Sequence, residues 1–413
     1  RGRMVHADPG RHLVDVSMFR LLWGPAVHAL CAITDNVTHE TVVEAALAGL
    51  QLCTTIAAQH ALDDVSDAVV AALAKIPMQV THIQQSAVSN STGGSLRPDV
   101  VFGRDVRMRA VTRAIATITN RHGDSLGSGW LQVMELVVVL YRQGILPETF
   151  TRALQGDGEG GLGVRAGEAM SLRVRRAHAA RVAAVAASNI SMFRSFTSIW
   201  GGGVSTAPAL DVAALLASDP YAEGGPNRGP LNESDRAAAQ AGEEVMTRCA
   251  FEDIFLDSKF LKQESLVHLV RAVIQASGPI PRPGLISQVQ VAGSQAYAAG
   301  GAGPSGGWDT SELALELLFG ILLRNRDRIA ALWPPVYEHL QAIFTHSRDV
   351  DPVLVQKAIM AVMRLCLRLL PYKPHISESL VRGVQLVSLV DEQVAADMAP
   401  TIAAELLGLL KGA

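Results

Sequence analysis

Helical periodicity is the feature that most limits what this chain can fold into. Apolar residues recur at intervals of three and four, a spacing that places them on one face of a helix. One such series is Trp130, Met134, Val137 and Tyr141, and a second is Ile359, Val362, Cys366 and Leu369. Alternating β-branched runs are scarce and aromatic residues make up only 5% of the chain, which argues against strands. The sequence predicts an all-α protein.

The number of helical segments predicts how they are arranged. Roughly a dozen to fifteen of them, joined by short loops, are typical of an α-solenoid of HEAT/armadillo-like helical pairs. No repeat of fixed length with recurring residues is present, so this prediction depends on helix number and apolar faces. One of these helices is expected to open at Pro335, with Val336, Leu340 and Ile343 pointing inward, because proline is tolerated in a first turn.

Glycine- and proline-rich stretches predict the domain organisation. Residues 206–232 are expected to link a first helical domain, 1–205, to a second, 233–413. A further stretch, 277–308, is an internal loop of the second domain, and neither composition can pack a core. A shorter polar loop is expected at 84–98.

Charge and cysteine content exclude several classes of protein. The net charge of -3 argues against a dedicated nucleic-acid binder, which needs basic residues to displace counterions from phosphate. The four cysteines are far apart in sequence, so no disulfide framework or zinc ribbon is predicted. No membrane span is expected, since the long uncharged stretch Ala45–Leu62 contains polar residues that are costly in hydrocarbon.

A short motif raises the possibility of a hydrolase. Gly123–Leu126 matches the GDSL string of a family of serine esterases, in which the serine is the nucleophile and an Asp-x-x-His supplies the base. No Asp-x-x-His occurs in the chain, and the string precedes a helix without a buried strand before it. We interpret it as a glycine turn followed by a helix cap.

Metal and cofactor motifs are also missing from the sequence. The twelve histidines form no H-E-x-x-H, and the glycine runs lack both phosphate-binding patterns. Asp63, Asp64 and Asp67 lack the glutamate that closes a calcium loop, so capping and a solvated helix face explain them. The sequence predicts no catalytic residue, no cofactor and no metal.

The segment 165–200 separates arginines from aromatic residues on a helical wheel. Such a helix can lie in an anionic membrane interface, where guanidinium groups meet lipid phosphates and the rings enter the acyl boundary. The same pattern also describes an ordinary solenoid helix with one face in the core and the other exposed to solvent. The candidate lipid-binding residues are Arg173, Arg176, Arg181, Arg194, Phe193, Phe196 and Trp200.

Several blocks of sequence, in order, resemble one family. They are Met18–Pro25, Ala45–Leu50 with Cys53, Leu62–Lys75, Arg121–Asp124 with Gly129 and Trp130, Leu146–Pro147, Ser258–Leu261 with Glu264–Leu266, and Glu316–Leu318 through Arg328 to Trp333 and Leu340. These blocks resemble the homology-downstream region of the Golgi-type large Arf guanine-nucleotide exchange factors, the brefeldin A-resistance/GNOM branch. The resemblance covers most of the chain outside the three loops, and implies that 1–205 and 233–413 are the first and second homology-downstream domains.

The resemblance also carries expectations about function. The family's exchange domain uses a glutamate finger in an F-R-L-P-G-E-type loop, whose charge expels the bound Mg²⁺ and phosphate. Here Phe19-Arg20-Leu21 continues as Leu22-Trp23-Gly24, without an acidic residue. The chain is therefore expected to be no enzyme itself, although the parent protein would be an exchange factor for Arf.

Two functions remain open. The resemblance implies a regulatory region that assists recruitment of a cytosolic exchange factor to the anionic surfaces of the Golgi and lipid droplets. Its partners would be Arf-family and possibly Rab-family small GTPases, reached through the parent protein, and no nucleic acid. The alternative is a scaffold that binds partner proteins or small GTPases without lipid contact.

Overall fold

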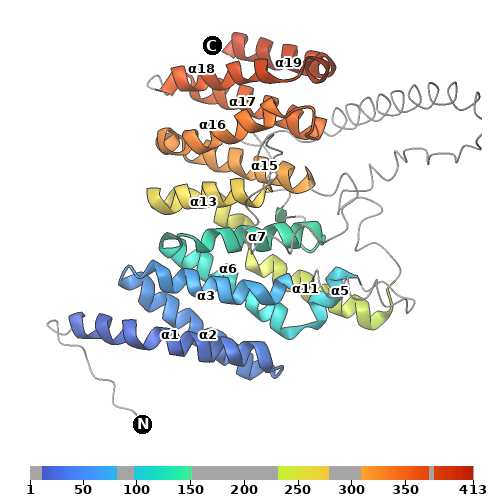
Figure 1. Cartoon of the computed structure of the whole chain (residues 1–413). Helices are drawn as coiled ribbons and strands as arrows, with labels where there is room; N and C mark the ends of the chain where they lie inside the picture. The colour runs from blue at the N-terminus through green and yellow to red at the C-terminus, as the bar shows by residue number, and fades with distance from the viewer. Residues whose placement is uncertain are drawn as a thin grey trace, which may run out of the picture. The chain divides into compact units, whose positions relative to one another are not determined.

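The structure, a computed structural model, describes residues 12–80, 97–147, 149–150, 231–278, 308–371 and 376–412. Within these ranges every regular element is a helix and no strand occurs (Figure 1). The chain is an all-α helical solenoid, which confirms the fold predicted from the sequence. Its helices group into two compact units, one formed by residues 1–151 and 226–276 and the other by 152–225 and 277–413.

The first unit is a stack in which each helix packs on its neighbours. α1 lies against α2, α2 against α3 and α6, α3 against α7, and α7 against α13, while α5 pairs with α11. Its described elements are α1 (His12–Asn36), α2 (Glu40–Gln59), α3 (Asp63–Met78), α5 (Pro98–Arg104), α6 (Val106–His122), η1 (Gly123–Ser125), α7 (Gly129–Arg142), α11 (Glu233–Cys249), α12 (Phe251–Leu256), η2 (Ser258–Phe260) and α13 (Gln263–Ala276).

Helix α7 shows how the apolar series produces the stack. Trp130, Met134 and Val137 are buried, as their spacing predicts, whereas Tyr141 at the end of the series is only half-buried. The helix lies between α3 and α13, so both sides of it are covered. Each buried side chain of this size contributes about 1.5–3 kcal/mol relative to exposure, and this burial holds the layers together.

A carboxylate on α3 caps the start of α7. Asp67 accepts hydrogen bonds from the backbone N–H groups of Gly127, Ser128 and Gly129 at 3.0, 2.8 and 2.9 Å, and from the Ser128 hydroxyl at 2.8 Å. These N–H groups are at a helix N-terminus, where no intrahelical partner exists and negative charge is favoured. The sequence predicted a capping role for this aspartate, and the structure shows that it caps a helix about sixty residues away in the sequence rather than its own.

We expect Asp67→Asn to destabilise the first unit by about 1–3 kcal/mol, because the amide turns an N–H donor toward the N–H groups of α7 and removes the charge. The change is measured as the loss in urea midpoint by circular dichroism. Asp64→Asn, at an exposed position on the same helix, is the matched control. An equal loss in both variants would contradict the capping role.

Helices α5 and α11 approach one another more closely than ordinary side chains allow. A Cβ atom built on Gly103 would lie 1.9 Å from the carbonyl oxygen of Ala238, and one on Gly242 would lie 3.2 Å from the Phe102 ring. Only glycine permits such backbone contact. The pair therefore depends on two glycines, one on each helix.

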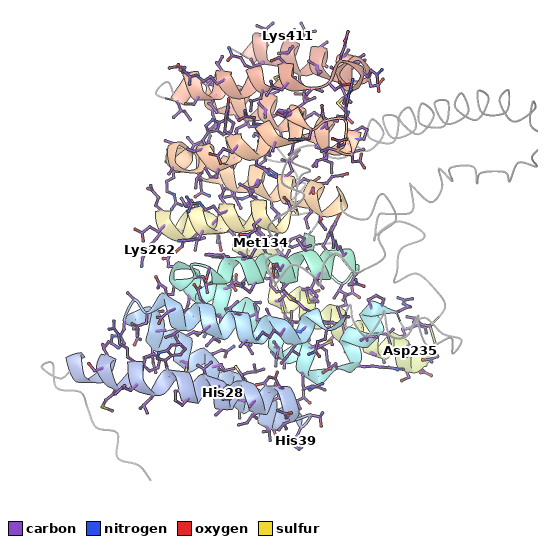
Figure 2. All side chains as sticks on the ribbon, viewed as in Figure 1. His28, His39, Met134, Asp235, Lys262 and Lys411 are labelled. Atoms are coloured by element: carbon purple, nitrogen blue, oxygen red, sulfur yellow. The ribbon has the colours of Figure 1, made fainter. Side chains whose placement is uncertain are left out.

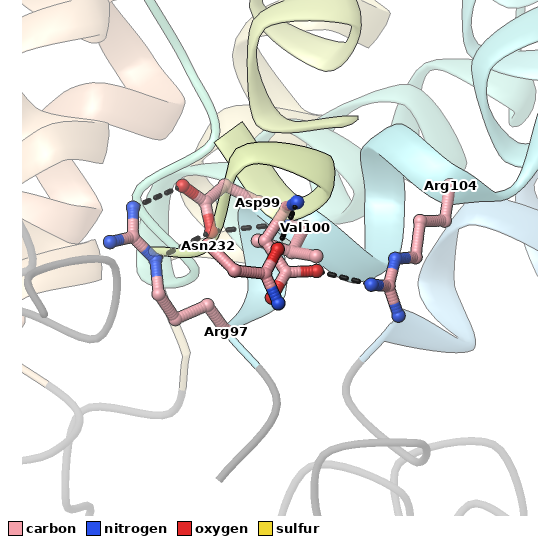
Figure 3. Close-up of polar contacts among 6 residues, drawn as sticks. Arg97, Asp99, Val100, Arg104 and Asn232 are labelled. Carbon is pink, nitrogen blue, oxygen red and sulfur yellow. Dashed lines mark hydrogen bonds and ion pairs between the residues drawn. The ribbon is translucent and has the colours of Figure 1, made fainter. Parts of the chain in front are cut away.

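Polar contacts form between the start of α11 and helix α5 (Figure 3). The Asn232 side chain caps α11 by accepting from the backbone N–H of Asp235 at 2.7 Å, and the Asp235 carboxylate in turn pairs with Arg104 of α5. Asp99 accepts two hydrogen bonds from Arg97, at 3.1 and 2.5 Å, just before and within the first turn of α5. The start of α11 is thus capped and joined to α5 by an ion pair.

Helices α11, α12 and α13 group with the first unit and not with the helices that follow them. The predicted second domain begins at 233, whereas α11, α12 and α13 pack within the first unit. The cause is the apolar and backbone contact of α11 with α5 and of α13 with α7, which sequence composition does not reveal. The homology-downstream domain limits themselves stay a prediction, and most of the three predicted loops, 84–98, 206–232 and 277–308, lies outside the described residues.

The second unit is a further stack of helices. α15 packs on α17, α16 packs on α17 and η5, and α17 also contacts α18 and α19. Its described elements are α15 (Trp308–Arg324), η3 (Arg326–Arg328), α16 (Ile329–Thr345), α17 (Pro352–Leu369), α18 (Ser377–Gln385), η5 (Leu386–Leu389) and α19 (Glu392–Gly412).

Helix α16 starts earlier than the sequence predicted. It begins at Ile329, directly after the η3 turn, so Pro335 lies inside the helix instead of in its first turn. Val336, Leu340 and Ile343 are fully buried as expected. Burial of this face outweighs the local cost of the proline.

A largely buried lysine, whose side chain is 24% exposed, joins α15 to α17. The Nζ atom of Lys357 lies 2.7 Å from Glu316 and 2.9 Å from Glu312. Burial disfavours the charged lysine, but the two carboxylates more than offset this, so the pKa of Lys357 is raised above its ordinary value. Replacing Lys357 would remove the cation that two carboxylates share in a largely buried site, so this contact favours the packing of α15 on α17.

The buried His339 makes the second unit sensitive to acid. Burial lowers the pKa of His339 from 6.5 to about 4, so the folded chain holds it neutral where the unfolded chain binds a proton. As the pH falls from 6.5 to about 4, the free energy of unfolding therefore falls, by up to ~3 kcal/mol.

We expect His339→Gln to flatten the decline of the melting temperature between pH 6.5 and 4.5, measured by calorimetry. His268→Gln, at an exposed position, should leave the decline unchanged. If the melting temperature declined equally steeply in wild type and His339→Gln, His339 would not be the cause of the acid sensitivity.

Candidate functional site

The lipid-binding residues predicted from the sequence lie outside the described part of the chain. All seven belong to the interval 151–230, so the interfacial helix and its alternative both stay predictions. The seven residues are Arg173, Arg176, Arg181, Arg194, Phe193, Phe196 and Trp200.

The GDSL string lies at a corner where helices join. Ser125 is buried at the end of η1, and Asp124 accepts from the backbone N–H of Lys262 at 2.5 Å and, through its carbonyl, from the Ser265 hydroxyl at 2.9 Å. The string therefore ties the corner between α6 and α7 to the start of α13. The predicted turn is present as η1. The predicted cap is not, because Asp67 binds the N–H groups at the start of α7 and Asp124 binds the start of α13 instead.

The neighbouring histidine is also held by a structural contact. His122 Nε2 lies 3.1 Å from the Thr55 hydroxyl of α2. Burial, and then the nearby Arg121, lower the pKa of His122. Within the described residues no group of three or more His, Cys, Asp or Glu side chains is arranged to hold a metal ion.

The most conspicuous surface of the first unit is an apolar face on α1, the helix at the edge of its stack (Figure 1). The large side chains on this face are Met18, Leu21, Leu22 and Ile33, which are 52%, 78%, 60% and 36% exposed. Four smaller apolar residues, Pro25, Ala26, Ala29 and Ala32, are exposed between them. We call these eight residues the α1 face.

The opposite side of α1 attaches the helix to the stack. Phe19 and Trp23 pack against a cluster formed by Ala57, Leu62 and Val65. The contacts with α2 and α3 fix the rotation of α1 about its axis. The α1 face consequently points away from the first unit, and Figure 2 shows the side chains of this helix around His28.

Charge is sparse along α1. The helix contains one arginine, Arg20, and two aspartates, Asp15 and Asp35. Its face therefore offers apolar area but little electrostatic attraction to an anionic surface, which requires lysine and arginine.

In the part of the chain that the structure describes, two helices are long and apolar enough to cross a membrane by length and composition. They are Val16–Asn36 with a mean hydropathy of 1.4 and Glu40–Gln59 with 1.5, and a bent pair within α19 passes the same test. The prediction from sequence that no segment could span a membrane is therefore wrong by length and composition. Helix α2 buries Val43, Leu47 and Leu50 in the first unit, whereas only 6% of the α1 window is buried.

Comparison with known proteins identifies the relatives of this chain. No family model matches it. It is 31% identical to the Arf guanine-nucleotide exchange factor GNOM of Arabidopsis thaliana over 401 residues, which are 97% of this chain and 24% of GNOM. It is 29% identical to the exchange factor GNL1 of the same plant, covering 98% of this chain and 24% of GNL1.

A third relative comes from an animal. The chain is 25% identical to the Golgi-specific brefeldin A-resistance guanine nucleotide exchange factor 1 homolog of Caenorhabditis elegans, over 94% of this chain and 18% of that protein. The chain is homologous to a region of the large Arf guanine-nucleotide exchange factors. It spans about a quarter or less of the curated relatives named here. The family resemblance seen in the sequence is confirmed, and the assignment to the homology-downstream region stays a prediction.

The α1 face was not among the residues predicted to bind lipid in this exchange-factor region. The sequence nevertheless carries a signal for it. Between Ser17 and Thr34 the only charged side chain is Arg20, so the helix is apolar on both sides, and a helix at the edge of a stack can bury only one of them. Met18–Pro25 contributed only to the family resemblance and not to the prediction of a binding surface.

We expect Leu21→Gln combined with Leu22→Gln to change the free energy of unfolding by less than about 0.5 kcal/mol, because exposed positions contribute little. Val27→Gln, on the buried side of the same helix, should cost several times more. Urea unfolding measures both. A loss for the double variant as large as that for Val27→Gln would show that the α1 face is packed inside the unit.

Proposed function

We propose that this chain is a non-catalytic, regulatory region that recruits a large Arf exchange factor to Golgi membranes. The observation that carries the proposal is the α1 face, which leaves large apolar side chains exposed. Contiguous exposed apolar surface marks a site of interaction with a membrane or a protein. A helix fixed to a rigid stack by its other side can enter a membrane interface without unfolding the unit.

The position of the Phe19-Arg20-Leu21 string supports a non-catalytic role. These residues lie within the continuous helix α1 and not in a loop, and no acidic residue follows them before Asp35. The family's exchange chemistry, as the resemblance implies it, needs a carboxylate thrust from a loop toward the nucleotide. We infer that exchange on Arf is performed by another part of the parent protein.

We expect the isolated chain to leave the release of fluorescent GDP from Arf at its spontaneous rate, measured in a stopped-flow fluorimeter. The parent protein provides the positive control. Acceleration of release in proportion to the concentration of the isolated chain would overturn the non-catalytic assignment.

Two possible anchors for membrane binding differ in their response to salt. Binding through the α1 face depends on apolar burial and is insensitive to ionic strength. Binding through the arginines of 165–200 depends on anionic lipid and weakens as the Debye length shrinks. The two contributions can therefore be separated in one assay.

We expect the chain to float with vesicles of phosphatidylcholine and phosphatidylserine, and Leu21→Gln with Leu22→Gln to weaken this about tenfold or more, since each buried leucine contributes about 1.5–3 kcal/mol. The triple variant Phe193→Ala, Phe196→Ala and Trp200→Ala tests the segment 165–200. A matched control is Phe260→Gln, which changes a side chain that is 74% exposed on η2.

Each outcome of the flotation assay has a definite meaning. If Leu21→Gln with Leu22→Gln loses flotation at both low and high salt, the result supports the α1 face as the anchor. Loss only in the triple variant, with release by salt, assigns the anchor to 165–200. Flotation unchanged in both variants would reject both helices as anchors.

A second candidate function is a scaffold that binds proteins without lipid. The low charge of α1 favours it, because a face with one arginine and two aspartates gains nothing from anionic lipid. If the chain is such a scaffold, it does not bind vesicles but forms a stable complex with a small GTPase or with another region of the parent protein. Size-exclusion chromatography with Arf- and Rab-type GTPases detects such a complex.

A further inference from the structure

Two helix-breaking residues stand side by side in the middle of α1. They are Gly24 and Pro25, about halfway along the helix. Proline has no N–H group, so the carbonyl of Leu21 lacks its helical partner at this point. Glycine leaves the backbone freer than any other residue does. The helix is therefore weakest where these two residues follow one another.

Packing does not account for the glycine. A Cβ atom built at position 24 would have nothing within 4 Å, whereas one built on Gly49 of α2 would lie 3.0 Å from the Leu30 side chain. Gly49 thus permits a close approach of two helices, and Gly24 permits none. A glycine that nothing crowds lowers the stability of its helix without improving a contact. Its effect at this position is on the freedom of the backbone.

The second half of α1 is firmly attached to the first unit. Val27 and Thr34 are buried, at 6% and 0% exposed, and Leu30 packs on a glycine of α2. The Nη1 atom of Arg107 on α6 donates a hydrogen bond to the backbone carbonyl of Asp35 at 2.7 Å. These contacts hold the part of the helix after the proline against both α2 and α6.

The first half of α1 is attached less firmly. None of residues 16–24, all of which the structure describes, is buried. Its inner side is formed by the half-buried rings of Phe19 and Trp23. These rings cover an apolar cluster on the neighbouring helices, which consists of Ala57, Leu62 and Val65. The two halves of one helix therefore differ in how strongly the stack holds them.

We propose that Gly24 and Pro25 form a hinge on which the first half of α1 opens away from the stack while the second half stays in place. Opening uncovers the apolar cluster and frees both aromatic rings. Because it exposes apolar surface to water, the open form is a minor population of the free protein. A ligand that binds the uncovered cluster stabilises the open form, which makes the hinge a regulatory device. The inference concerns the free chain and does not rest on membrane binding.

Thiol labelling of the 413-residue chain measures the opening of each half. In a variant whose four native cysteines are replaced by alanine, Val65→Cys places a thiol beneath the two rings. Thr34→Cys places one on the inner side of the second half. Both positions are 0% exposed, so a maleimide reacts only with open molecules. We expect the thiol at position 65 to react at least about tenfold faster than the thiol at position 34.

Stiffening the hinge should remove most of this difference. Gly24→Ala with Pro25→Ala restores the missing N–H and adds a Cβ atom that meets no neighbour. Labelling at position 65 should then slow by at least about tenfold, and labelling at position 34 should not change. The matched control is Gly408→Ala on α19, where a Cβ atom also has nothing within 4 Å. This control should leave both labelling rates unaltered.

Two results would overturn the proposal. Equal labelling rates at positions 65 and 34 would mean that α1 opens as one body. A rate at position 65 that does not respond to Gly24→Ala with Pro25→Ala would mean that the opening does not use this hinge. If Val65→Cys lowers the melting temperature, Ala57→Cys provides a second buried thiol in the same cluster, and the same comparison decides.

Discussion

Burial of one apolar face of each helix against the next is the interaction on which this structure depends. Helix α7 buries the series from Trp130 to Val137 and contacts α3 and α13, and α17 buries Ile359, Val362, Cys366 and Leu369 and contacts α15, α16, α18 and α19. Polar contacts act at the corners, where helix ends leave N–H groups without intrahelical partners. Asp67 and Asp124 supply oxygens at two such corners, so they fix which helices meet and add to the stability that burial provides.

This constraint explains how much of the fold was predictable. The steps of three and four identified the buried sides of α7, α16 and α17, because a helical wheel needs only local sequence. The wheel does not say which neighbour covers a face. The pairing of α5 with α11 depends on Gly103 and Gly242, which are about 140 residues apart in the sequence, and this pairing places α11 in the first unit. The start of α16 at Ile329 was missed because Pro335 was given more weight than the burial of Val336 and its neighbours.

The candidate surfaces were harder to find from sequence. The GDSL string forms the turn that the sequence predicted, but Asp124 binds the start of α13 and does not cap α7, because both contacts depend on residues far apart in the sequence. The α1 face was overlooked because exposure depends on a helix lying at the edge of its unit, which composition alone does not show. The arginine and aromatic residues of 165–200 were recognised by their pattern and lie outside the described residues.

The α1 face differs in chemistry from the segment predicted to bind lipid. It carries large apolar side chains on a helix with a single arginine, whereas the sequence of 165–200 combines arginines with aromatic residues. On the proposed function the two would therefore contact a membrane through different interactions, apolar burial in the first and attraction to anionic lipid in the second.

The depth of α1 in a membrane tests the central claim most directly. A spin label is attached at position 22, in a variant whose native cysteines are replaced, and its exposure to oxygen and to a water-soluble nickel complex is measured on phosphatidylcholine and phosphatidylserine vesicles. The account predicts that the label gains oxygen contact and loses contact with nickel when vesicles are added, while a label at position 260 stays in water. A label at position 22 that remains equally accessible to nickel with vesicle-bound protein would contradict it.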